Sequence, residues 1–165
     1  ADKHPITRRL ARKNTESSDH LAELTEKLER VVSGDQTIND DAKRIERLLV
    51  RAQKVCPVTG KDLTSMGGAV KATVSKATVF LCCKGCFGKK IPSKHWDTVT
   101  ANLIKAQGRC PVMDKPLPTN PKSVLVEGRR IFVCCPPCTK KIEDDPKKYI
   151  TAVDRLLEKN LGDDK

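Results

Sequence analysis

Apolar residues recur with helical spacing in four stretches of the chain. The stretches begin at Leu21, Ile45, Trp96 and Tyr149, and each continues with apolar residues at intervals of three or four positions. This spacing predicts amphipathic helices. Ser33-Gly34-Asp35 separates the first two stretches, and Asn39 or Asp40 can begin the second of them. We therefore expect a helical hairpin at the start of the chain, then two further helices.

Two shorter stretches alternate apolar and polar residues, as half-buried strands do. Val124 and Val126 precede Glu127-Gly128, and Ile131 and Val133 follow it. A two-residue turn that ends in glycine between two alternating stretches predicts a β-hairpin. Matching apolar residues occur upstream at Ala72, Val74, Val79 and Leu81. We therefore expect a second hairpin there.

Both hairpins belong to a longer repeat. LLVRAQKVCPVTGKDL at residues 48–63 matches NLIKAQGRCPVMDKPL at residues 102–117, and FLCCKGCFGKKI at 80–91 matches FVCCPPCTKKI at 132–142. Such a repeat indicates one supersecondary unit that is used twice. We expect four segments along the chain: a flexible basic tail at 1–17, a helical hairpin at 18–53, a first cysteine-rich metal-binding module with a linking helix at 54–107, and a second such module with a C-terminal helix at 108–165.

Each module contains four cysteines. They are Cys56, Cys82, Cys83 and Cys86 in the first module, and Cys110, Cys134, Cys135 and Cys138 in the second. A turn and the end of a hairpin can bring such thiolates together, and four thiolates suit tetrahedral Zn²⁺. We expect two Zn²⁺ ions, one per module, although the same ligands would accept copper or another soft metal. The predicted fold class is α+β, with two tandem zinc-binding β-hairpin/helix modules joined by helices and preceded by an αα-hairpin.

The adjacent cysteines leave the ligand set open. Neighbouring residues of a strand point to opposite faces, so Cys82 and Cys83 can both bind one ion only if the chain bends between them. Either of the two can pair with Cys86, at C-x3-C or C-x2-C spacing. The remaining thiol is then a fourth ligand, a buried neighbour or a free reactive group. The same alternatives apply to Cys134 and Cys135.

Both copies resemble TRASH domains, and the second is also similar to the end of a YHS domain. The second copy has a glycine turn, an aromatic strand, two cysteines and a D-P-x-x-Y tail, at Gly128, Phe132, Cys134, Cys138 and Asp145 to Tyr149. The resemblance covers about residues 54–150. It implies a treble-clef-like fold, metal binding at three cysteines per module, and a role in heavy-metal sensing or handling. Cys83 and Cys135 are additions to this pattern, and the first copy has His95-Trp96 in place of the tail.

Other chemistry for these residues is less favoured by the pattern. Disulfide frameworks seldom repeat as C-C-x-x-C at the end of a hairpin, and a thioredoxin-like redox motif needs a βαβ context. His95 is expected at the surface or at a helix start rather than as a ligand. Met66 and Met113 are candidate soft ligands for Cu(I). Met113 aligns with Thr59, however, which favours a packing role for this methionine.

Composition limits the classes of function. The chain has 32 Lys and Arg against 21 Asp and Glu, and its net charge of +11 makes an acidic partner plausible. Aromatic residues are only 3% of the chain, so stacking on nucleic-acid bases is poorly supported. The lysines are spread along the sequence, as on a solvated surface. No carboxylate pair, Ser-His-Asp set or glycine-rich phosphate loop indicates an enzyme, and we expect none.

Three hypotheses of function follow from these patterns. In the first, the protein binds metal ions in heavy-metal sensing or handling. In the second, the zinc ions are structural, and the N-terminal helices bind a partner protein or a second copy. The third and weakest hypothesis is a basic, zinc-finger-like nucleic-acid binder.

No apolar run is long enough to span a membrane. The start at Ala1 fits an exported mature chain and a cytoplasmic protein alike.

Overall fold

The computed structural model describes residues 38–162. The predicted tail at 1–17 and the first helix of the predicted hairpin lie outside these residues. The chain divides into two compact units, Ala1–Arg44 and Ile45–Lys165, and both cysteine modules belong to the second. A helix over residues 38–53, here called the leading helix, agrees with the helix that was predicted from Asn39 or Asp40.

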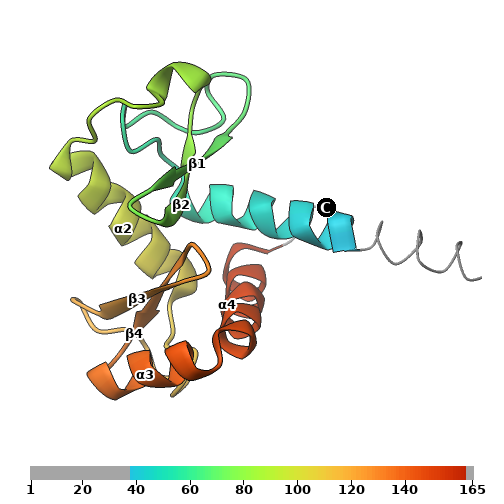
Figure 1. Ribbon diagram of the computed structural model, residues 1–165, viewed down its shortest axis with the longest axis vertical. Helices are drawn as coiled ribbons and strands as arrows, with labels where there is room; N and C mark the ends of the chain where they lie inside the picture. Colours follow the sequence, from blue (N-terminus) through green and yellow to red (C-terminus); the bar gives the residue numbers. More distant parts are fainter. Residues whose placement is uncertain (1–37, 163–165) are drawn as a thin grey trace, which may run out of the picture. The chain divides into compact units, whose positions relative to one another are not determined.

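The rest of the described chain repeats a hairpin followed by helical segments. In chain order it contains β1 (Val70–Val74), β2 (Ala77–Leu81), the 3-10 helix η1 (Lys84–Cys86), α2 (Ser93–Gln107), β3 (Lys122–Val126), β4 (Arg129–Val133), α3 (Pro136–Asp144) and α4 (Pro146–Leu161). Helix α2 leaves the first module and leads into the second (Figure 1). The predicted α+β class is confirmed for this part of the chain.

Each sheet is one antiparallel hairpin with a two-residue turn. Ser75 and Lys76 join β1 to β2, and Glu127 and Gly128 join β3 to β4. All four turn residues have positive φ, between 47° and 75°. Such turns twist in the same sense as the strands that they join. Both hairpins therefore lie where the alternating pattern predicts them.

The segments after the paired cysteines differ between the modules. The repeat predicts a short helix in each, but the first module forms only the three-residue η1, whereas the second forms the nine-residue α3. Gly85 and Gly88 lower helix stability in the first, and Gly88 adopts φ +70°. In the second, Pro136 begins α3, where its fixed φ suits the first helical position.

Helix α4 begins in the D-P-x-x-Y stretch, and the local sequence explains why. The Asp145 carboxylate accepts a hydrogen bond from the backbone N–H of Lys148, and Pro146 occupies the first turn. An N-cap acceptor followed by proline is a strong helix start. Tyr149 then packs, half-buried, against the core of the second module.

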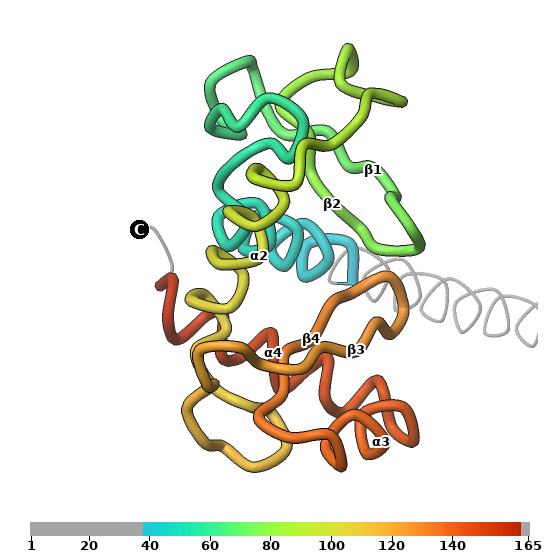
Figure 2. The backbone as a smooth tube through the Cα atoms, turned by 90° about the vertical axis from the view of Figure 1, so that its left-hand side faces the viewer, coloured from blue at the N-terminus to red at the C-terminus, as the bar shows by residue number. Residues whose placement is uncertain are grey.

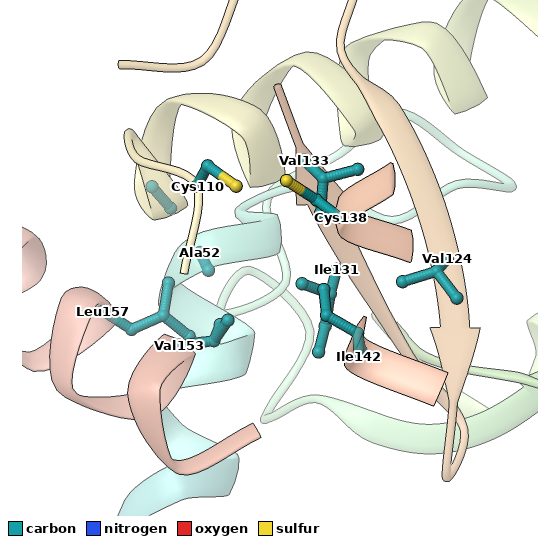
Figure 3. Close-up of a cluster of buried hydrophobic side chains, with 10 residues drawn as sticks. Ala52, Cys110, Val124, Ile131, Val133, Cys138, Ile142, Val153 and Leu157 are labelled. Atoms are coloured by element: carbon teal, nitrogen blue, oxygen red, sulfur yellow. The ribbon is translucent and has the colours of Figure 1, made fainter. Parts of the chain in front are cut away.

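Each module has its own buried core. Leu63, Val79 and Leu81 lie in the first core, together with Cys56, Cys82 and Cys86. The second core contains Ala52 of the leading helix and side chains of both hairpin strands, α3 and α4, as Figure 3 shows. Leu49 packs against both cores. The two cysteine groups are therefore parts of two hydrophobic cores.

The modules also contact each other directly. The backbone N–H of Thr78 in β2 donates to the carbonyl of Gly128 in the second hairpin at 2.6 Å. The Arg130 guanidinium lies 5.4 Å from the centre of the Trp96 ring in α2. Figure 2 shows the turn of the β3–β4 hairpin approaching the β1–β2 hairpin. These contacts join the two hairpins, which belong to separate sheets.

Candidate metal centres

A tight turn presents the first cysteine of each module. The N–H of Cys56 donates to the carbonyl of Lys61, and the carbonyl of Cys56 accepts from the N–H of Gly60. Cys110 makes the same two bonds with Lys115 and Asp114. We call residues 56–61 and 110–115 the two knuckles. Their shared hydrogen bonds show that the sequence repeat is also a structural repeat.

The second strand of each hairpin returns the other cysteines to the knuckle. Cys82 directly follows β2 and Cys86 ends η1, whereas Cys134 directly follows β4 and Cys138 lies in the first turn of α3. The Sγ atoms of Cys56, Cys82 and Cys86 lie within 4.8 Å of one another, and those of Cys110, Cys134 and Cys138 do likewise. Figure 3 shows the Cys110 and Cys138 sulfurs turned toward each other. Each group of three can hold a metal ion.

The sulfur separations in the first cluster fit a tetrahedral ion. Zn–S bonds of about 2.3 Å in tetrahedral geometry separate the sulfurs by about 3.8 Å. The Sγ of Cys86 lies 3.9 Å from that of Cys56 and 3.7 Å from that of Cys82. All eight cysteines of the chain are free thiols. The structure therefore brings the C-x3-C pair and the knuckle cysteine together.

Cys83 and Cys135 lie at the edges of the clusters. The Cys83 Sγ is 3.6 Å from that of Cys86, and the Cys135 Sγ is 2.9 Å from that of Cys138 and 3.8 Å from that of Cys134. Neither belongs to its group of three. Both side chains are partly exposed. Each is thus placed next to a cluster and within reach of an added reagent.

One buried glutamine in each module joins the segment before the knuckle to the hairpin. The Gln53 side chain donates to the carbonyl of Phe80 at 2.7 Å and accepts from its N–H at 2.9 Å, and it also donates to Val55. Gln107 makes the equivalent bonds to Phe132, at 2.7 Å and 3.0 Å, and to the carbonyl of Arg109. The repeated Ala-Gln pair was visible in the sequence, but its role was not recognised. A polar residue kept at the same place in both copies, next to a knuckle, was the available signal.

The protonation states of the clustered thiols differ. Burial raises the pKa of Cys56, but N–H donors of Cys82, Thr59 and Val58 outweigh it and lower the pKa to about 7. Burial and the neighbouring thiols raise the pKa of Cys86 to about 12. In the second cluster the pKa of Cys110 is lowered and that of Cys138 is raised, for the same reasons. In each cluster, the knuckle cysteine therefore loses its proton more readily than the cysteine of the helical segment.

The remaining candidate ligands lie outside the two groups of three. His95 Nδ1 is 3.2 Å from the carbonyl of Val58, so its ring lies against the first knuckle rather than among the sulfurs. Met66 and Met113 are exposed. The lysines near the cysteines, namely Lys84, Lys89, Lys90, Lys140 and Lys141, are also exposed.

Comparison with known proteins adds no relative. No protein-family model, no curated protein and no solved structure matches the chain. Among the described residues, no helix has the length and apolar character that crossing a bilayer requires. The functional argument therefore depends on the two clusters.

Proposed function

We propose that this protein binds two metal ions, one in each three-cysteine cluster, and that the ions are Zn²⁺. The observation that carries this proposal is the recurrence of one arrangement: a knuckle thiol and two hairpin-end thiols, brought within 4.8 Å of one another in both modules. Thiols at such distances cannot all ionise without a cation between them, as the raised pKa of Cys86 indicates. A dication would remove this penalty.

Cys83 and Cys135 are the candidates for a fourth ligand in this proposal. The Cys83 Sγ is already 3.6 Å from the Sγ of Cys86, which is close to the edge of a tetrahedral site. Binding of this thiol would bring the site to four thiolates. If these two thiols do not bind, the fourth position is open to water or to an incoming ligand.

Within metal binding, we favour a role in handling the ion over a purely structural role. The resemblance to TRASH and YHS domains supports this choice, and so does the partial exposure of Cys134. The alternative is an interaction subunit whose zinc ions serve only to hold the fold. Slow exchange at both sites would favour that alternative.

Native mass spectrometry of protein purified without added metal tests the proposal. We expect two zinc ions per chain, and one ion in each of the variants Cys56→Ser and Cys110→Ser. Thiol counting before and after denaturation then reports how many cysteines the metal protects. A metal-free protein whose mass is lowered by two hydrogens per cysteine pair would contradict the proposal, because it would mean disulfides.

A further inference from the structure

Three pairs of equivalent positions, at the knuckles and the first hairpin-end cysteines, are more buried in the first module, whereas after the third cysteine Ile91 is less buried than Ile142. In the first module a knuckle proline, the leucine after the knuckle and the first hairpin-end cysteine are all buried. In the second module the equivalent side chains are only half-buried. The pairs are Pro57 and Pro111, Leu63 and Leu117, and Cys82 and Cys134. On the side of the knuckle and the first hairpin-end cysteine, the first cluster is therefore less accessible to solvent than the second.

A hydroxyl group supports the first cluster and has no counterpart in the second. Thr59 Oγ1 lies 3.4 Å from the Sγ of Cys82, and it also accepts from the backbone N–H of Lys61. Since that acceptor role leaves its proton free, the hydroxyl can donate to the sulfur. Met113 occupies the equivalent knuckle position and is 46% exposed. The second cluster has an uncharged, soft thioether where the first has a hydrogen-bond donor.

The His95 imidazole covers the first knuckle. His95 Nδ1 lies near the Val58 carbonyl, and a Cβ added to Gly60 would lie 2.8 Å from His95 Nε2. In the second module the place of Gly60 is taken by Asp114. Lys148 takes the place of His95, and its ammonium lies 5.6 Å from the centre of the adjacent Tyr149 ring. The knuckle at residues 110–115 is contacted instead by Arg109, whose exposed guanidinium bonds the carbonyl and the carboxylate of Asp114.

We propose that the two sites divide the work: the cluster at Cys56, Cys82 and Cys86 retains a structural ion, and the cluster at Cys110, Cys134 and Cys138 exchanges its ion with outside ligands. This inference rests on the proposed function. Exchange requires an incoming thiolate, imidazole or chelator to reach the metal, and it requires one protein thiolate to leave. Burial hinders the first step. The Thr59 hydroxyl hinders the second, because its contact with the Cys82 Sγ holds that side chain in the position from which it would bind the ion.

Chelator competition on the zinc-loaded full-length protein tests this division. The loaded protein is mixed with a chromogenic zinc chelator and a thiol-alkylating reagent, and peptide mapping identifies which cysteines are alkylated as each ion leaves. We expect two phases of release. The early phase exposes Cys110, Cys134 and Cys138, and the late phase exposes Cys56, Cys82 and Cys86. Release of both ions in one phase, or in the opposite order, would overturn the inference while leaving metal binding intact.

A reciprocal exchange of the knuckle residues tests the cause. Thr59→Met should speed release from the first cluster by about tenfold, and Met113→Thr should slow release from the second. Met66→Thr is the matched control, because Met66 is an exposed methionine outside both knuckles. None of these variants removes a thiol. Unchanged rates in both knuckle variants would show that Thr59 and Met113 do not set the difference. A protein that binds no metal at all would instead refute the proposed function.

Discussion

At the scale of single residues, Gln53 and Gln107 take the place of a neighbouring strand. Each side-chain amide both donates to and accepts from one backbone residue of a hairpin, Phe80 or Phe132. Both glutamines are almost fully buried, at 2% and 3% exposure. Buried polar groups of this kind are stabilising only while every partner is satisfied. Each glutamine therefore fixes the distance between the hairpin and the start of the knuckle in its own module.

Replacing one glutamine should weaken its own module. Gln107→Leu removes the hydrogen-bond partners of the N–H and the carbonyl of Phe132. Each unsatisfied buried group costs about 1–3 kcal/mol. We expect a lower free energy of unfolding in denaturant titration of the zinc-loaded protein, and faster release of the second ion. Gln53→Leu is the matched variant and should affect the first ion instead. A change below about 0.5 kcal/mol, the usual effect of a surface substitution, would contradict this role.

Metal binding should release protons, because the thiols of the helical segments are protonated at neutral pH. Burial raises the pKa of Cys86 to about 12, whereas the pKa of Cys56 is lowered to about 7. A bound ion requires both as thiolates. Cys86 must therefore lose its proton throughout the neutral range, and Cys56 adds to this release only as the pH falls through about 7. Zinc affinity should consequently decrease as the pH falls.

Calorimetry of zinc binding in buffers with different ionisation enthalpies measures these protons. The metal-free protein should show a proton release that grows toward acid pH. In Cys56→Ser, the additional release below about pH 7 should be smaller. An observed heat that is independent of the buffer would mean that no protons leave, and the assigned protonation states would be wrong.

At the scale of elements, the C-terminal ends of the leading helix, α2 and α4 are each bound by a side chain of another helix. Asn102 of α2 donates to the carbonyl of Gln53 at the end of the leading helix, and Asn160 of α4 donates to two carbonyls at the end of α2. Arg51 donates to the carbonyls of Leu161 and Gly162 at the end of α4. Unpaired carbonyls at helix ends need such partners. These contacts hold the helices that carry both glutamines.

An ion pair between β4 and α4 should be important for the second module. Arg129 Nη2 lies 2.5 Å from Asp154 Oδ1, and the two side chains are only 15% and 17% exposed. Removing one partner of such a pair leaves a poorly solvated charge, at a cost of about 3–5 kcal/mol when burial is complete. We expect Asp154→Asn to lower the free energy of unfolding by somewhat less than this, as measured by denaturant titration.

Asp114→Asn is the control for that variant. Asp114 pairs with Arg109 at 3.0 Å, but its side chain is 79% exposed, and exposed pairs contribute about 0–1 kcal/mol. Asn also tolerates the positive φ of this position, 49°. Equal losses in the two variants would show that burial of the Arg129 pair is unimportant.

At the scale of the unit formed by residues 45–165, the two modules are joined by a close backbone contact. The carbonyl of Gly128 accepts from Thr78, and a Cβ at Gly128 would lie 2.9 Å from Thr78 Oγ1. Leu49 adds a shared apolar contact, because it packs against both cores. The modules are therefore coupled, and damage at their contact should destabilise both.

Two glycine substitutions separate this contact from backbone strain. Gly128 and Gly88 have similar φ values, 75° and 70°, so alanine should cost about 1–2 kcal/mol of strain at either position. Only Gly128 has a neighbouring atom close to the added carbon, since nothing lies within 4 Å at Gly88. Gly128→Ala should therefore lower the thermal unfolding temperature more than Gly88→Ala does. Equal shifts would mean that the contact between the modules contributes little to stability.

Local sequence was sufficient to predict the repeat, both hairpins, the helix across residues 93–107 and the cysteine positions around each cluster. These features depend on residues close together in the chain: the Glu127-Gly128 turn, the alternation of Val124 and Val126, and the helical spacing from Trp96. The short helix expected in each module is only the three-residue η1 after Cys83, whereas the second module forms the nine-residue α3. The glycines of that segment outweighed its likeness to the second copy.

The tertiary structure decided which thiols meet and how the two clusters differ. Cys82 rather than Cys83 joins Cys56 and Cys86 because β2 ends at Leu81 and the chain bends at both cysteines, a bend that alternation alone does not specify. The cover of Gly60 by His95 joins residues that lie far apart in the chain. In the sequence repeat, Thr59 and Met113 are simply different residues at equivalent positions. Whether the residue at this position contacts a cluster sulfur depends on where the hairpin-end cysteine lies. Long-range packing determines that position.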